Sequence, residues 1–587
     1  MARRAPTGLE PDLSVHGPPT AREPRATLAR QWMGWALPAI IVVVAALLQG
    51  WLSLRPGLWV DELFSLAVAT GHSVEHPAAD ARPALGDFVD HPRPVPAAAI
   101  AAYATHDRPP ASAGRVVRAV FLSDTSPPLY YLLLSAWTRL AGTSDAALRL
   151  FSTACALLCL PLLFLVGREI GGRTTGLVAG ALFAAAPPVL YFASEGRMYA
   201  LTWLWTLALA WLALRLVRDD AAAGARWPTL VAWAVVGAAG LLTHYFFAFV
   251  WGAVLLWLWL HPGPVRRLQL AAGAALTGLL VLPWFARVPE SLGRWRVSGG
   301  WLDGELTARQ MAKGPLLLLK YMVFWGADYR DKGELLAIAL AALLVAAMLW
   351  RGPRRWVTGR AQLLWLWVLA AAVGPLVFDL LLGTTSSQIG RYGLAGLPAA
   401  LLLVALGTGA LPPAARLAWT ALLVVSWWPG LRDVFVRPAR PFHPFAQMGR
   451  RIADWHRAAP NDSSDLVLVH SIPTGTIGVA RYLRTGPPMT SWTVRLRERT
   501  PAELDALVAG RCRVALVKVH DLLDPAPAEG WLRERSTHLV RDELGRAEIL
   551  YFTLRTPPGA SADDCRAGGA DPTRPSTSQS PTRSTGT

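Results

Sequence analysis

Two adjacent carboxylates, Asp61 and Glu62, follow the first long apolar run of the chain, in the stretch GLWVDELFSL (57–66). Acidic residues at such a place often only begin a helix, because carboxylates are stabilised at helix N-termini. The alternative is chemistry, since a positioned carboxylate can act as a general base or bind a metal ion. Adjacent residues on a helix point about 100° apart, so one carboxylate can face a cavity while the other forms a structural contact.

Further side chains that could do chemistry lie downstream. The arginine guanidinium is a planar fork that suits phosphate oxygens, and histidine can bind phosphate or a metal. The candidates stand in the stretches YFASEGRMYAL, THYFF and SSQIGRYGLAGLP, and they are Glu195, Arg197, Tyr199, His244, Tyr245, Arg391 and Tyr392. An ordinary turn or an interfacial aromatic pair at the end of a membrane span is the alternative interpretation of each stretch.

Two other acids lie close to apolar segments. Asp124, in SDTSPPLYY, precedes a short apolar helix and could orient or deprotonate a substrate. Asp379 lies within GPLVFDLLLG, where an acid is a functional candidate by default. Its position near the outer end of that segment would also let it reach water. Four histidines of the first long loop lack a metal-ligand spacing, and we expect them in solvent: His72, His76, His91 and His106.

Composition predicts that these residues belong to a polytopic membrane protein. Of the 587 residues, 53% are hydrophobic and only 17% are charged, whereas soluble domains carry about 25% charged residues. The 27 tryptophans agree with this class, because amphipathic rings collect at membrane interfaces. The net charge of +17 does not indicate nucleic-acid binding, because the basic residues are spread between apolar runs.

The apolar segments predict a mainly α-helical membrane bundle with about eleven spans. A span needs about 20 residues, so the uncharged segment 227–260 is divided into two. The stretch 126–142 is short, and we expect an interfacial helix there. The other expected spans are 32–54, 150–166, 174–193, 199–214, 268–286, 334–350, 361–382, 392–411 and 415–431.

Arginine clusters predict the orientation of the bundle. If 126–142 does not span, every basic loop cluster lies on the cytoplasmic side, as the positive-inside rule requires. If it did span, all of these clusters would lie outside. We therefore expect a protein of the plasma (inner) membrane with its N-terminus in the cytoplasm. Asp61, Arg197, His244 and Arg391 then lie on the outer side, in loops that could converge on one cavity.

The remaining parts complete the expected domain organisation. The first outer loop, 55–146, belongs to the membrane region, and strand-like and capped-helix patterns beyond that region indicate a small extracytoplasmic α/β domain. The expected parts are a disordered basic leader at 1–31, the catalytic membrane region at 32–431, the α/β domain at 439–555 and a disordered tail at 556–587.

Outer arginines beside a carboxylate favour sugar transfer from a polyprenyl phosphate to an acceptor hydroxyl. Arg197 and Arg391 would stabilise the leaving phosphate, and Asp61 would remove the proton of the acceptor in one inverting displacement. A transporter or lipid flippase is the alternative, although transporters usually bind at the bilayer midplane between repeats, and no repeat is seen. A scaffold without activity would make Asp61 dispensable.

The motifs in their order resemble the GT-C superfamily of membrane glycosyltransferases, within the family 39 protein mannosyltransferase group that includes bacterial aminoarabinose transferases. The motifs that carry the resemblance are WVDELFSL, DTSPPLYYLLLSAWTRLAG, ALRLFS, SEGRMYAL, THYF and GRYGLAGLPA. The resemblance implies Asp61 as the base, juxtamembrane helices in the first loop, a lipid-linked monophosphate sugar as donor and a cell-envelope molecule as acceptor. Ser126 stands where the family commonly has His, so the sequence leaves open whether a divalent metal is used.

Overall fold

The computed structural model describes residues 24–555 apart from short internal gaps. Of the disordered leader expected at 1–31, residues 1–23 lie outside the described residues, whereas residues 24–31 are helical, so the expectation of disorder is wrong for them. The tail expected at 556–587 lies outside the described residues. The internal gaps are 77–79, 125, 219–222, 262–265, 295–299, 301, 324–329, 351, 353, 437–443, 459–464, 484–485, 492–499 and 520–526.

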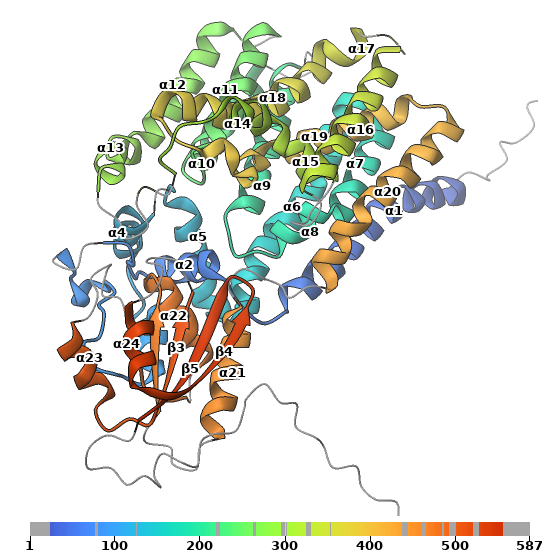
Figure 1. The fold of residues 1–587 in the computed structure, drawn as a ribbon. Helices are drawn as coiled ribbons and strands as arrows, with labels where there is room; N and C mark the ends of the chain where they lie inside the picture. Colours follow the sequence, from blue (N-terminus) through green and yellow to red (C-terminus); the bar gives the residue numbers. More distant parts are fainter. Residues whose placement is uncertain are drawn as a thin grey trace, which may run out of the picture.

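A helical bundle makes up the larger part of the molecule (Figure 1). Each segment that we expected to span contains a helix, and helix α1 begins at Pro24, earlier than the expected 32. The long bundle helices are α1 (Pro24–Ser53), α6 (Asp145–Gly171), α7 (Arg173–Ala185), α9 (Tyr199–Leu216), α10 (Ala223–Leu241), α11 (Phe247–Leu260), α12 (Arg267–Phe285), α16 (Arg330–Trp350), α18 (Gly359–Leu382), α19 (Leu397–Ala410) and α20 (Pro413–Val436). The shorter elements among them are α8 (Pro187–Ala193), α13 (Val288–Leu292), α14 (Ala308–Lys313), η4 (Gly314–Leu316), α15 (Leu317–Val323), α17 (Arg354–Val357), η6 (Ser386–Gln388) and η7 (Gly390–Gly396).

The number of membrane spans is supported in part. Six helical segments of the described chain are long and apolar enough to cross a membrane. The number rises to seven if α7 and α8, which meet at a bend of 64°, form one span. Pro187 and Pro188 begin α8, and proline cannot continue the hydrogen-bond ladder of a preceding helix. The full number of eleven stays a prediction.

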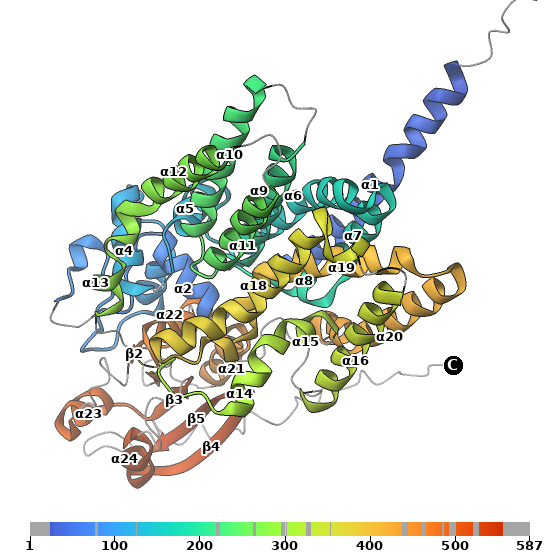
Figure 2. The same cartoon turned by 90° about the horizontal axis from the view of Figure 1, so that it is seen from above.

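The first loop folds into short helices that lie between the bundle and the C-terminal sheet (Figures 1 and 2). These elements are α2 (Val60–Ala69), η2 (Pro83–Leu85), α3 (Ala97–Ala101), η3 (Ala102–Ala104), α4 (Ala113–Ser123) and α5 (Leu129–Ala141). Helix α5 has 13 residues and is the short helix that we expected at 126–142. Because the loop is packed on both sides, the expectation of solvated histidines is wrong for His72 and His76, which are 4% and 2% exposed.

The C-terminal region contains a five-stranded sheet in the order β2-β1-β3-β5-β4. Strand β1 pairs in parallel with β2 and β3, whereas β5 pairs antiparallel with β3 and β4. The two expected strands and the helix capped by Thr500 are present as β1, β3 and α23. The elements here are α21 (Phe445–Arg457), β1 (Asp465–His470), α22 (Pro473–Tyr482), β2 (Met489–Ser491), α23 (Pro501–Val508), β3 (Arg513–Lys518), α24 (Pro527–Arg535), β4 (Ser536–Leu544) and β5 (Ala547–Leu554).

The acid within α18 has a structural role in the described fold. Asp379 is 2% exposed, so the expectation that it could reach water is wrong. Its carboxylate accepts hydrogen bonds from the hydroxyl of Thr384 at 2.5 Å and from the backbone N–H groups of Ser386 and Ser387 at 2.7 Å each. These bonds satisfy the buried charge and fix the turn that leads to η6 and η7.

Candidate active site

Helix α2 separates the two adjacent carboxylates. Glu62 is fully buried and forms a two-point ion pair with Arg149 of α6, with both N–O distances at 2.7 Å. It also accepts the backbone N–H of Gly196 at 2.9 Å and that of Trp59 at 3.3 Å. With its oxygens committed to these donors, Glu62 holds α2 against α6 and the turn that precedes α9.

Asp61 instead faces two arginines from distant parts of the chain. Its carboxylate lies 3.2 Å from Nη1 of Arg391, and the Asp61 side chain remains 22% exposed. Nη1 of Arg197 donates to the backbone carbonyl of Asp61 at 3.3 Å and to the hydroxyl of Ser65, one helical turn later, at 3.0 Å. The structure therefore brings Asp61, Arg197 and Arg391 together, although they lie up to 330 positions apart.

Both arginines keep an unused donor. The Nε atoms of Arg197 and Arg391 are buried and have no hydrogen-bond partner within the described part of the chain. A buried N–H without an acceptor costs about 1–3 kcal/mol. Two such donors beside one carboxylate form a site that an anion with several oxygens would complete.

Aromatic rings surround the arginine pair. The guanidinium carbon of Arg391 lies 5.9 Å from the ring centre of Trp59 and 6.0 Å from that of Tyr392. The ring of His244 lies 6.0 Å from Tyr392 and 6.2 Å from Tyr199. Trp59 and Tyr392 thus place aromatic rings beside the Arg391 guanidinium, and a cation is attracted to the face of such a ring.

His244 is held in its neutral form. Burial, followed by the charges of Arg197 and Arg391, lowers the pKa of His244 to about 3. Its Nδ1 accepts the backbone N–H of Phe246 at 3.2 Å, so the proton of the neutral ring is on Nε2. His244 is therefore suited to donating a hydrogen bond and not to contributing a charge near physiological pH.

Asp124 reaches the same region from the end of α4. It accepts a hydrogen bond from the hydroxyl of Tyr131 in α5. The negative charges of Asp124 and Asp61 both act on the Arg197 guanidinium.

Two other candidates lie beside this group. Glu195 is 1% exposed, and its charge acts on the hydroxyl groups of Tyr199 and Tyr321. Tyr245 turns toward α12, where its hydroxyl accepts a hydrogen bond from the indole of Trp284 at 3.0 Å.

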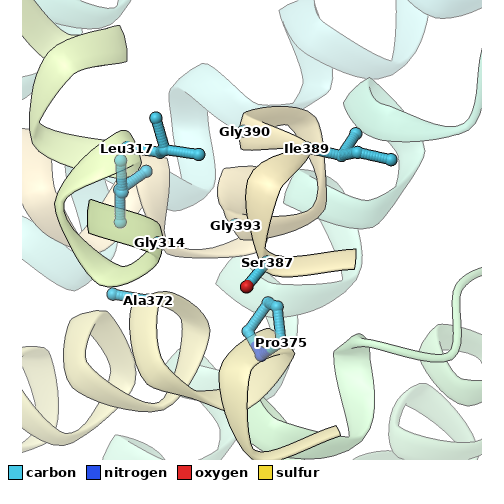
Figure 3. A pocket seen from close by; sticks show the side chains of 9 residues that line it. Gly314, Leu317, Ala372, Pro375, Ser387, Ile389, Gly390 and Gly393 are labelled. Atoms are coloured by element: carbon cyan, nitrogen blue, oxygen red, sulfur yellow. The ribbon is translucent and has the colours of Figure 1, made fainter. Parts of the chain in front are cut away.

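A small cavity of about 10 Å³, with room for about one water molecule, lies beside η7 (Figure 3). Gly390 and Gly393, on either side of Arg391 in η7, line it together with Leu317 and Pro375. A Cβ atom at Gly390 would lie 1.9 Å from the ring of Tyr321, so only glycine allows this ring to lie against η7. No three His, Cys, Asp or Glu side chains of the described residues are close enough to hold a metal ion.

Sequence reasoning missed three residues of this site. Arg149 was seen only as part of the motif ALRLFS, Trp59 as part of WVDELFSL and Tyr131 as part of the short apolar helix. Arg149 stands directly before the apolar run expected to span at 150–166, and a charged residue beside such a run is the signal that could have indicated a buried partner.

The apolar helical bundle with short helices in its first loop resembles the class of GT-C membrane glycosyltransferases. Residues 125–288 match the family of dolichyl-phosphate-mannose-protein mannosyltransferases.

Solved structures agree with this class. The chain is similar to ArnT from Cupriavidus metallidurans in the apo state, with 14% identity, a TM-score of 0.53 and coverage of 89% of this chain and 98% of that chain. It is also similar to the same ArnT bound to undecaprenyl phosphate, with 16% identity, a TM-score of 0.52 and the same coverage. At these identities the likeness shows the fold. No curated protein matches the sequence.

Proposed function

We propose that this protein transfers a sugar from a polyprenyl-monophosphate donor to a hydroxyl of a cell-envelope acceptor. The observation that carries the proposal is the partly exposed Asp61 carboxylate, 3.2 Å from Arg391 and on the helical turn that Arg197 contacts. Asp61 is the general base of the reaction. The family resemblance and the undecaprenyl phosphate bound to the ArnT structure support this class of donor.

The donor phosphate binds to the two arginines. Their buried Nε groups supply hydrogen bonds to phosphate oxygens, in addition to two positive charges. As the bond between the sugar C1 and the phosphate oxygen lengthens, negative charge gathers on that oxygen. The arginines stabilise this charge, and the surrounding aromatic rings limit its screening by water.

The acceptor hydroxyl reacts on the opposite face of the sugar. Asp61 takes the hydroxyl proton while the oxygen attacks C1, and the polyprenyl phosphate leaves with the electron pair of the broken bond. One displacement of this kind inverts the anomeric centre. Asp61 leaves Arg391 as the phosphate takes its place, so the two partners of the present ion pair serve different substrates.

The site lies at the outer surface of the plasma (inner) membrane. This orientation is supported by the arginines of the loops on the opposite side, among them Arg168, Arg173 and Arg215. The N-terminus is then cytoplasmic, and the C-terminal sheet is extracytoplasmic. Residues of the chain itself are assigned to phosphate binding and to proton removal. Measuring sugar transfer after dialysis against EDTA tests whether a divalent ion is also needed.

Replacement of the base tests the proposal. Purified Asp61→Asn should transfer sugar from a polyprenyl-phosphate sugar at least about 100-fold more slowly than the unchanged protein, because a general base contributes roughly 10²–10⁴-fold. Glu305→Gln is the matched control, since Glu305 is an exposed acid of another loop. Full activity of folded Asp61→Asn would exclude the base. Movement of a lipid-linked sugar across vesicles without any transfer would favour a flippase.

A further inference from the structure

The turn that enters α2, residues 55–59, is held from the bundle side by two residues of α6. Arg149 donates to the backbone carbonyl of Arg55 at 2.6 Å and to that of Gly57 at 2.5 Å. Asp145, the first residue of α6, accepts the backbone N–H of Gly57 at 2.8 Å. Gly57 adopts a φ of +100°, a conformation that favours glycine.

The same turn is held from the other side by the end of α22. The hydroxyl of Tyr482 accepts the backbone N–H of Leu58 at 2.7 Å and donates to Asp145 at 2.6 Å. Arg481 donates to Asp145 at 2.9 and 3.1 Å, and its side chain is 5% exposed. Asp145 therefore links the C-terminal region to the turn and to α6.

Helices α22 and α2 are also packed closely against each other. A Cβ atom at Gly478 would lie 2.8 Å from a methyl group of Leu63 in α2 and 2.7 Å from the ring of Phe445 in α21. Leu63 and Phe445 are fully buried. The contact leaves no room for α2 to shift toward the sheet without moving α22.

The carboxylate of Asp61 is three residues from the Leu58 N–H that Tyr482 holds. Trp59, the residue between this bond and α2, places its ring beside the Arg391 guanidinium. A displacement of the Leu58 backbone would therefore move the start of α2 and the aromatic wall of the arginine site together.

We propose that Tyr482, supported by Arg481, is a positioning residue for Asp61, so that the C-terminal region completes the active site of the membrane bundle. The inference rests on the proposed function of Asp61 as the base. Removal of the Tyr482 hydroxyl leaves the Leu58 N–H without its acceptor and loosens the turn. A misplacement of a reacting group by about 1 Å can lower a rate by about 100-fold, while the arginines that bind the donor keep their places.

The test compares Tyr482→Phe with the matched variant Tyr551→Phe in the full-length protein. Tyr551 is 4% exposed and lies in β5 of the same sheet, away from the turn at 55–59. In Tyr482→Phe we expect kcat to fall by about 10-fold or more and the donor KM to change by a smaller factor, because Asp61 lies on the displaced start of α2 whereas Arg197 and Arg391 belong to other elements. Tyr551→Phe should keep both constants.

Hydrogen exchange gives a second readout that does not depend on activity. The amide of Leu58 should exchange at least about fivefold faster in Tyr482→Phe than in the unchanged protein, because its hydrogen bond has been lost. Unchanged exchange at Leu58, or an unchanged kcat in folded Tyr482→Phe, would overturn the inference. A protein that shows no sugar transfer before any substitution would instead contradict the proposed function.

Arg481→Lys is the alternative test variant if Tyr482→Phe does not fold. Lysine keeps the positive charge beside Asp145 but loses the fork with which Arg481 holds both Asp145 and the carbonyl of Thr143. The same fall in kcat with a smaller change in the donor KM is expected. A normal kcat in this folded variant would also overturn the inference.

Discussion

Asp61 and Glu62 are neighbours in the chain but differ in the cations that they meet. Glu62 meets the buried Arg149, whereas Asp61 meets Arg391 at the edge of a partly exposed site. The cost of removing a buried ion pair from water is offset only when further hydrogen bonds satisfy its charged atoms, and Glu62 accepts such bonds. Of these two consecutive residues, Glu62 therefore holds the structure of the site, and Asp61 presents a partly exposed carboxylate.

Arg391 should matter more for the donor than for the acceptor. Arg391→Ala removes a charge and a buried donor from the phosphate, and charge-assisted hydrogen bonds are worth about 1.5–3 kcal/mol. We expect the donor KM to rise by roughly 10- to 100-fold, with a smaller change in the acceptor KM. Arg309→Ala, at an exposed arginine of α14, is the control for steady-state kinetics. An unchanged donor KM in Arg391→Ala would argue against a phosphate contact.

At the scale of elements, the short helices of the first loop decide the topology. Helix α5 is too short to cross a bilayer, since 13 residues of helix extend only about 20 Å. A reporter fused after residue 142 should therefore register on the outer side, and one fused after residue 172 should register in the cytoplasm. Protease protection and cysteine labelling provide the measurement. A cytoplasmic signal after residue 142 would overturn the proposed orientation.

The first loop also carries a buried histidine that makes it sensitive to acid. Burial is the main reason that the pKa of His72 falls from 6.5 to about 4, while nearby Asp107 opposes the fall. Because the pKa of His72 is lower in the folded state, the unfolded state binds a proton at a higher pH than the folded state does. The contribution of His72 to the free energy of unfolding is therefore complete above pH 6.5 and is lost as the pH falls toward 4.

Thermal unfolding measured at pH 7.5, 5.5 and 4 checks this expectation. Over this range, protonation of His72 alone should lower the free energy of unfolding of the unchanged protein by an amount on the order of 2–3 kcal/mol. His72→Gln should lose less on acidification, whereas His538→Gln, at an exposed histidine of β4, should behave like the unchanged protein. Equal acid sensitivity of the two variants would show that His72 does not titrate as described.

At the scale of the whole molecule, the first loop joins two folding regions. It lies between the bundle and the sheet (Figure 1), and Val95 pairs with Met489 of β2 through two backbone hydrogen bonds of 2.9 Å. The side chain of Thr490 adds a bond to the carbonyl of His91 at 2.6 Å. These contacts bring the C-terminal region close to α2, on which our inference about Tyr482 depends.

The sequence by itself was sufficient for the broad architecture. Long uncharged segments predict apolar helices, because a buried or lipid-facing backbone must satisfy its own hydrogen bonds. The length of 126–142 predicted α5, and apolar runs predicted β1 and β3. These patterns are local, so they can be recognised without knowing which elements meet.

Only the tertiary structure decided which side chains meet. Arg149 became the partner of Glu62 across 87 positions, and Arg391 became the partner of Asp61 across 330. His72 and Asp379 are also buried, His72 beside Tyr103 and Asp107 of the same folded loop and Asp379 against the turn at 384–387. Such contacts depend on how helices and the sheet pack, and packing joins residues of any separation in sequence. Local periodicity could therefore supply the elements and the candidate residues, but not the division of roles between the two carboxylates.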